Sequence, residues 1–183
     1  GLYIELYWDT EIDFDLHLLH PESIDWSEVP LGPRKCSAQP GCADGPEWFE
    51  PGIHDDPRLL RDIWWGSHGP EVIHIRQPHE GSYALGAGPY LAFPEFEATH
   101  NGNAWIVIHC GPPGGTPRIF NLGPTYIGGM KFWRAGEIVV DERGDCKWVE
   151  FIDEEGGPDV CWWSTVVSYR SGYPDGGVCP SSL

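Results

Sequence analysis

Positive charge is scarce in this sequence. Among 183 residues there are 11 Lys or Arg against 28 Asp or Glu, which gives a formal net charge of −17 at pH 7. No Lys or Arg precedes Arg34. Without a basic cluster, a chain cannot neutralise the phosphates of a nucleic acid or dock on an anionic lipid surface. We therefore expect no nucleic-acid partner and no membrane partner.

Long apolar runs and helical periodicity are also missing. No segment has the length and hydrophobicity of a membrane span or a signal peptide, so we expect no membrane insertion. The sequence instead holds 24 Gly, 18 Pro, 10 Trp, 7 Tyr and 7 Phe, which is typical of strands joined by tight turns. We expect a mature or trimmed extracellular portion of a longer protein.

Alternating apolar and polar residues, interrupted by Gly and Pro, predict the fold class. We expect an all-β antiparallel sandwich of jelly-roll type that forms a single domain over residues 1–183. A long insertion loop occupies 22–70, and a Gly/Pro/Ser-rich tail occupies 170–183. The pattern predicts strands over 2–8, 12–19, 72–76, 82–93, 105–110, 118–122, 131–140, 146–152 and 160–169.

The six cysteines are even in number and none forms a C-x-x-C pair. This usage indicates three disulfides and an oxidising compartment, so we expect a secreted or cell-surface protein. Six cysteines allow fifteen connectivities. We favour the one that pairs cysteines close in sequence, Cys36 with Cys42 and Cys146 with Cys161, and that fixes the C-terminal tail through the remaining pair, Cys110 with Cys179.

An acidic strand near the start of the chain suggests a metal site. In the predicted strand over 12–19, Asp13, Asp15 and His17 share one face, and Phe14 and other apolar residues share the opposite face. Adjacent carboxylates repel each other unless a cation or basic side chain neutralises them. Because Ca²⁺ prefers oxygen ligands, we expect calcium there. The alternative is a solvated acidic strand face.

Five spaced motifs follow one another along the chain: Leu6-Tyr7-Trp8-Asp9-Thr10, Asp13-Phe14-Asp15-Leu16-His17, Asp55-Asp56-Pro57, Gly69-Pro70-Glu71 and Gly81-Ser82-Tyr83. In this order they resemble a bacterial family, the YfaP-type secreted β-sandwich domains allied to pre-peptidase C-terminal domains. The resemblance implies a non-catalytic accessory module of an extracellular protein. It also implies that Asp13, Asp15 and Glu71 are calcium ligands.

One departure from that family lies in the segment 62–68. Where relatives carry an acidic run, this chain keeps Asp62 and adds two tryptophans and a histidine. The complete set of expected Ca²⁺ ligands is Asp13, Asp15, Asp62, Glu71 and Asp56.

The tryptophans of the long loop suggest a recognition surface. Exposed aromatic rings on a secreted sandwich are suited to a glycan or a protein at the cell surface. We expect a ligand-binding platform made by Trp64, Trp65, His68 and Trp48. The alternative is that these rings pack in the core.

These features together predict a secreted, calcium-binding, non-catalytic module for adhesion or for recognition of a glycan or protein. One alternative is a structural subunit that self-assembles into an extracellular filament or coat. Another is a metal-dependent hydrolase that coordinates its metal through His17, His74 and His109. We do not expect an enzyme, because the sequence has no H-E-x-x-H and no G-x-S-x-G motif.

Overall fold

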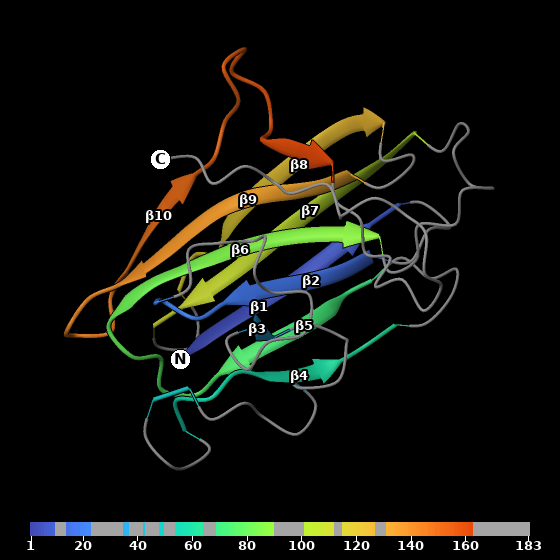
Figure 1. Cartoon of the computed structure of the whole chain (residues 1–183). Helices are drawn as coiled ribbons and strands as arrows, with labels where there is room; N and C mark the ends of the chain where they lie inside the picture. Colours follow the sequence, from blue (N-terminus) through green and yellow to red (C-terminus); the bar gives the residue numbers. More distant parts are fainter. Residues whose placement is uncertain are drawn as a thin grey trace, which may run out of the picture.

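The computed structural model describes residues 1–9, 14–22, 35–36, 42, 48–49, 54–63, 69–89, 101–111, 115–126 and 131–162. These residues form two antiparallel sheets and contain no helix (Figure 1). The predicted all-β antiparallel sandwich is confirmed. In this part of the chain no helix is long and apolar enough to cross a membrane.

Sheet A has five strands, and β1 lies at its centre. The strand order is β4 (Arg58–Arg61), β5 (Glu71–Ile75), β1 (Leu2–Trp8), β7 (Asn101–Cys110) and β8 (Arg118–Tyr126).

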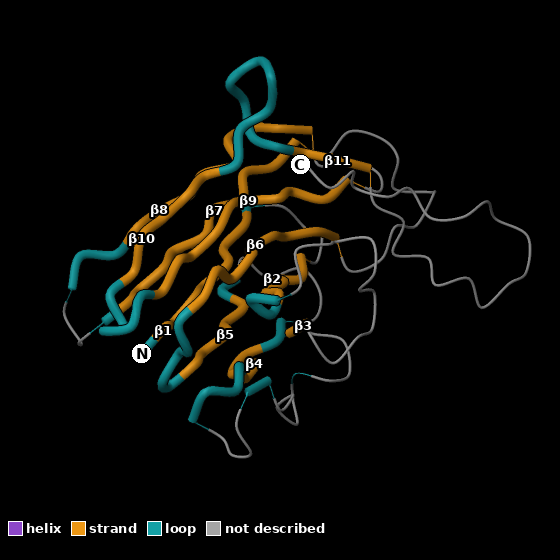
Figure 2. The backbone as a smooth tube through the Cα atoms, turned by 60° about the vertical axis from the view of Figure 1, so that its left-hand side comes forward, coloured by secondary structure: helices purple, strands orange, loops and turns teal. Residues whose placement is uncertain are grey.

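Sheet B has β6 at its centre. The strand order is β10 (Cys146–Glu150), β9 (Lys131–Val140), β6 (Gly81–Pro89), β2 (Phe14–Leu19) and β3 (Lys35–Cys36), and β11 (Val160–Trp162) also pairs with β9. Strands of the two sheets run in similar directions in Figures 1 and 2, as in an aligned sandwich.

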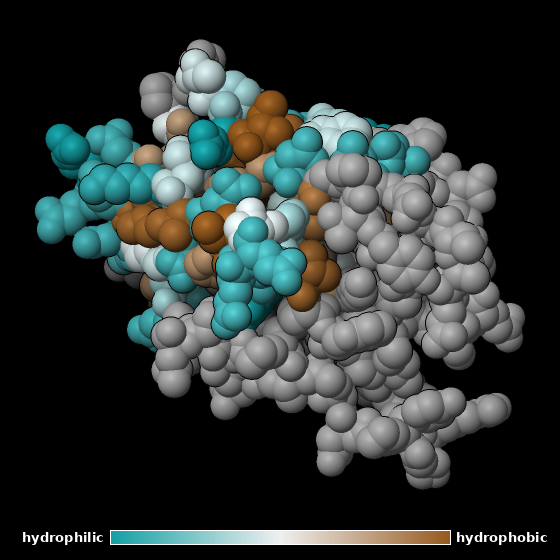
Figure 3. Space-filling model, turned by 90° about the horizontal axis from the view of Figure 1, so that it is seen from above, coloured by the Kyte–Doolittle hydropathy of each residue, from teal (hydrophilic) through white to brown (hydrophobic). Residues whose placement is uncertain are grey.

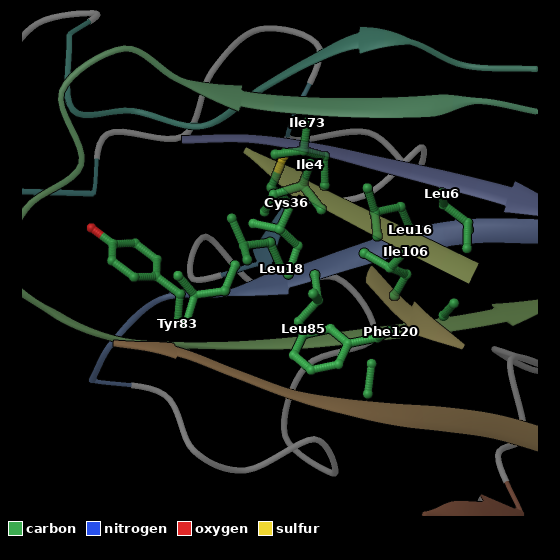
Figure 4. Close-up of a cluster of buried hydrophobic side chains, with 14 of the residues drawn as sticks. Ile4, Leu6, Leu16, Leu18, Cys36, Ile73, Tyr83, Leu85, Ile106 and Phe120 are labelled. Atoms are coloured by element: carbon green, nitrogen blue, oxygen red, sulfur yellow. The ribbon is translucent and has the colours of Figure 1, made fainter. Parts of the chain in front are cut away.

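The core lies between the two sheets. Residues of β1 alternate between buried and partly exposed positions along the whole strand, which is the period-2 pattern of a strand with one face on a core. Figure 4 shows Ile4, Leu16, Leu85 and Ile106 converging from four strands of both sheets. Burial of each such side chain contributes about 1.5–3 kcal/mol, so this layer is the main source of stability.

Most predicted strands are confirmed. The strand over 2–8 has the predicted bounds, and both hairpins, β7 with β8 and β9 with β10, pair as expected. The strands β3 and β4 lie inside 22–70, where we predicted only a loop. They were missed because both are short, and an edge strand such as β4 is exposed and shows no clear apolar period.

Two disulfides join described residues. Cys36 pairs with Cys42, as predicted. Cys110 pairs with Cys146, so the predicted pairs Cys110–Cys179 and Cys146–Cys161 are wrong. Sequence spacing favoured a bridge within one hairpin, but the sandwich brings the end of β7 in sheet A to the start of β10 in sheet B, at a Cα–Cα distance of 6.2 Å. These bridges indicate an oxidising compartment.

The described surface is mostly polar. Four large apolar side chains are exposed, namely Leu60, Ile119, Val149 and Ile152. Seen from above, the hydrophobic residues form small separate patches among hydrophilic ones (Figure 3). Isolated exposed apolar residues are normal on a soluble protein and do not mark a site.

Candidate functional site

Glu71 is a fully buried carboxyl group between the two sheets. It begins β5 and pairs with Leu6 of β1, whose side chain points into the core. Its Oε2 accepts a hydrogen bond of 2.7 Å from the backbone N–H of Leu16 in β2. Glu71 therefore links sheet A to the backbone of sheet B, at a part of β2 that β3 does not reach, because β3 pairs only with Leu18 and Leu19.

Two further carboxylates lie close to Glu71. Burial raises the pKa of Glu71 most strongly, and the negative charges of Asp15 and Asp62 raise it further. The hydrogen bond from the Leu16 N–H lowers it, and the net result is a pKa raised from 4.5 to about 10. Asp15 is itself buried, and Asp62 is partly buried. Three of the predicted calcium ligands, from β2, β5 and the segment after β4, thus lie near enough to interact electrostatically.

One oxygen of Glu71 lacks an N–H or neutral O–H donor among the described residues. This Oε1 is buried, and the side chain within hydrogen-bonding reach of Glu71 is the carboxyl group of Asp62, which can pair with it only through a shared proton. A buried oxygen without a donor costs about 1–3 kcal/mol. Such an atom beside two carboxylates requires either a proton or a cation.

The backbone before Glu71 explains how this carboxyl group reaches its position. Gly69 has φ +56°, in the left-handed region that favours glycine. A Cβ there would lie 2.7 Å from the carbonyl oxygen of Leu6 and 3.3 Å from the ring of Trp8. Glycine therefore lets the chain run directly against β1, which places Glu71 opposite Leu6.

The second face of β2 is buried, so the alternative of a solvated acidic strand face is wrong for Asp15 and His17. Every described residue of this strand is buried, including Asp15 and His17. The ring of His17 contacts the ring of Phe132 edge-on, with centroids 5.3 Å apart. Gly86 lies opposite His17 in the register, and a Cβ there would collide with Phe132. Sequence alternation could not show this, because β2 is an interior strand covered on both faces.

Asp56 has a different role from the one predicted. Its Oδ1 accepts a hydrogen bond of 2.8 Å from the backbone N–H of Trp48, so this bond joins two parts of the long 22–70 region. Trp48 is buried and packs against Tyr83, with ring centroids 6.1 Å apart. The prediction that Trp48 belongs to an exposed binding platform is wrong, and core packing is the correct alternative for this residue.

Four of the predicted site residues lie outside the described residues. They are one expected metal ligand and three members of the expected binding platform: Asp13, Trp64, Trp65 and His68. Among the residues that the structure does describe, no group of three or more His, Cys, Asp or Glu side chains is arranged so that it could hold a metal ion. The cluster around Glu71 therefore supplies part of a ligand set and not a complete one.

The strand histidines do not converge. His74 and His109 flank Tyr3 on the outer face of sheet A, each with its ring centroid 6.0 Å from that of Tyr3. His17 lies on β2 of the other sheet, against Phe132. The predicted site made by His17, His74 and His109 is therefore not formed.

Sequence reasoning also missed the structural half of the role of Glu71. The resemblance named it as a ligand, but nothing in the spacing indicates that it holds the edge of a strand in the opposite sheet. The available signal was a carboxylate that opens an otherwise apolar strand, Glu71-Val72-Ile73, because such a residue is buried only when it has partners.

No protein-family model matches the chain, and no curated protein matches it. Among solved structures, the chain is similar to one titled as a protein of unknown function, SAV2460. The match covers 81% of this chain and 86% of that one, with 14% sequence identity and a TM-score of 0.46. A likeness at this level assigns neither a family nor a function.

Proposed function

We propose that this protein is a calcium-binding, non-catalytic β-sandwich module of an extracellular or cell-surface protein, with Glu71 at the centre of its calcium site. The observation that carries the proposal is the buried Oε1 of Glu71, which has no N–H or neutral O–H donor among the described residues and lies beside the carboxylates Asp15 and Asp62. An all-oxygen set of carboxylates is the donor set that Ca²⁺ prefers.

The role of the cation would be structural. Glu71 belongs to sheet A, Asp15 to sheet B, and Asp62 to the segment that leads out of β4. A cation bound at Glu71, with at most one of the two aspartates as a second ligand from this cluster, would join sheet A either to sheet B or to the end of the long 22–70 region. Ca²⁺ takes about six to eight oxygen ligands, so backbone carbonyls, water or Asp13 would have to complete the set.

An extracellular setting supports the proposal. The disulfides Cys36–Cys42 and Cys110–Cys146 indicate an oxidising compartment. Compartments of that kind also supply calcium at concentrations that suit sites of modest affinity, about 10⁻⁴–10⁻³ M. We expect a module of this type to serve adhesion or recognition. The filament-subunit and hydrolase alternatives stay predictions, and no observation on the described residues favours either.

The test is calcium titration of the purified protein, read by calorimetry and by thermal melting, in the wild type and in Glu71→Gln. Glutamine keeps a carbonyl oxygen that can accept from the Leu16 N–H but removes the negative charge. We expect the wild type to bind calcium and to melt at a higher temperature when it is bound, because a ligand that binds only the folded state stabilises it. Glu71→Gln should lose both effects.

The matched control is Glu142→Gln, which removes one carboxylate from an exposed turn. It should respond to calcium as the wild type does. Calcium responses that are equal in all three proteins would mean that any binding occurs elsewhere on this acidic chain. No response in the wild type would show that a proton, and not a cation, occupies the site at Glu71.

A further inference from the structure

The outer face of sheet A, which points away from the core, is rich in aromatic and cationic side chains. The strand register places them in rows across the sheet. The first row runs in the order Arg58, His74, Tyr3 and His109, and the second row contains Arg61 and Glu5. The third row pairs Tyr7 with Trp105. We call these side chains the sheet A outer face: Tyr3, Glu5, Tyr7, Arg58, Arg61 and Trp105.

The aromatic residues form a partly exposed platform. The rings of Tyr7 and Trp105 are stacked, with centroids 5.7 Å apart and planes within 5° of parallel. Tyr3 lies two residues before Glu5 on the same face of β1. All three rings are half-buried, so they keep surface that a ligand could cover. Rigid rings of this kind offer a large contact area at little cost in conformational entropy.

Glu5 lies at the centre of this face and is held by two neighbours. Its Oε1 accepts a hydrogen bond of 3.1 Å from the Tyr7 hydroxyl, and its Oε2 lies 3.2 Å from Nε2 of His109. Burial and the charge of Glu5 raise the pKa of Tyr7, so its phenol stays neutral and keeps donating. The polar groups are therefore fixed before a ligand arrives.

The charge of this face differs from that of the whole chain. Arg58 and Arg61 are exposed at its edge, and Glu5 is the one carboxylate at the outward positions of the described strands of sheet A. The chain as a whole carries −17. Because charges are screened beyond about 8–10 Å at physiological salt, this local excess of cations decides what can bind here.

We propose that the sheet A outer face binds an acidic polysaccharide. Sugar rings would pack on Tyr7 and Trp105, and the carboxylates of uronic acid units would pair with Arg58 and Arg61. Arginine forms bidentate hydrogen bonds with carboxylates and contributes both affinity and geometry. The inference deepens the recognition role of the proposed function, but it uses a face separate from the inward-facing Glu71.

A polysaccharide suits this face better than a protein does. The centres of protein interfaces are depleted of charged residues, whereas the centre of this face is a carboxylate. Glu5, with its two bound neighbours, can accept hydrogen bonds from the hydroxyl groups that a sugar presents. The rings beside it can cover the apolar faces of the same sugar units.

The test measures binding of an oligogalacturonate by calorimetry, with a neutral oligosaccharide of equal length for comparison, in buffer that contains a calcium chelator. The chelator is needed because calcium can cross-bridge uronates. We expect the acidic sugar to bind and the neutral one to bind at least tenfold more weakly. Arg61→Ala and Trp105→Ala should each weaken binding about tenfold, as expected for one charge-assisted or aromatic contact.

Arg143→Ala is the matched control, because Arg143 is an arginine at an exposed hairpin tip far along the chain. It should bind like the wild type, and so should Glu71→Gln. Melting temperatures show which variants are folded. If Trp105→Ala is unfolded, Arg58→Glu serves as the second test.

Three results would overturn the proposal. The first is equal binding of acidic and neutral sugars, or no binding of the acidic sugar. The second is binding that appears only with calcium and is lost in Glu71→Gln, which would support the calcium site and reject this face. The third is tighter binding of a polyglutamate peptide of equal charge, which would mean that the face recognises acidic proteins. If the wild type binds the acidic sugar but does not bind calcium, the proposed calcium site is rejected and the proposal for this face stands.

Discussion

The stability of this protein should depend on pH through Glu71. In the absence of metal, burial and the neighbouring carboxylates Asp15 and Asp62 raise the pKa of this group to about 10, whereas in an unfolded chain it is near 4.5. Between those values the folded state keeps a proton that the unfolded state has lost. Stability must therefore fall as pH rises, by about 1.4 kcal/mol per pH unit for one proton.

The best window for this measurement is about pH 7 to 9. His74 has a lowered pKa, because of burial and nearby positive charge, and its effect has the opposite sign: stability rises with pH as the unfolded histidine loses its proton. Above pH 7 that contribution is complete. The unfolding free energy should then fall by about 2.7 kcal/mol over two pH units from Glu71 alone.

Calcium should remove this slope. A cation at Glu71 replaces the proton, so a saturated folded state has no proton to lose in this window. The apparent calcium affinity should rise about tenfold per pH unit until the proton no longer competes. At a calcium concentration 100 times the dissociation constant, the gain in stability is about 2.7 kcal/mol.

Urea unfolding at pH 7, 8 and 9, with and without calcium, measures these effects in the wild type and in Glu71→Gln. Glu71→Gln should show neither the slope nor the calcium response, and it should be more stable than the metal-free wild type at pH 9. Glu142→Gln, at an exposed turn, should follow the wild type. Identical slopes in the wild type and Glu71→Gln would refute the reasoning, because the titrating group would then be another residue.

Two other predictions concern links that hold the sandwich together. Serine at both Cys110 and Cys146 should lower the unfolding free energy by about 4 kcal/mol, since this bridge closes a loop with a sequence separation of 36. Peptide mapping of the intact protein should recover this disulfide pair. Any other partner for Cys146 would contradict the structure. Arg134→Met should cost about 3–5 kcal/mol in denaturant unfolding, because it leaves Asp159, which now pairs with Arg134 at 2.6 Å, without its partner. Arg143→Ala should cost under about 0.5 kcal/mol, and a similar loss in both arginine variants would show that the buried pair has no special role.

The fold could be predicted because strand signals are local. The alternation over Leu2–Trp8 and the turn residues between β9 and β10 each specify a strand or hairpin from adjacent residues. The strand order could not be predicted, because β1 and β2 are adjacent in sequence yet belong to different sheets. The Cys110–Cys146 bridge depends on that arrangement, which is why spacing alone gave the wrong partner.

Part of the candidate site could be predicted and part could not. Residue type and family resemblance identified Asp15, Asp62 and Glu71, and the structure brings their charges together. The prediction for Trp48 failed because the sequence of a long loop does not show which of its aromatic rings is buried. The sheet A outer face was missed because Tyr7 and Trp105 come from strands about a hundred residues apart in sequence, and only the register joins them.

The predicted calcium ligands Asp15 and Glu71 lie inside the sandwich and not on a solvated strand face. A solvent-facing pair of acidic residues needs no cation, because water screens the repulsion. The structure instead buries Asp15 on an interior strand and aims Glu71 at the backbone of Leu16 from the opposite sheet. In that setting a negative charge on Glu71 is costly, so the site must take up a proton or a cation whenever the two sheets are packed. The requirement for a counter-charge follows from closing the sandwich, and this is why the same residue should govern both the calcium response and the pH dependence of folding.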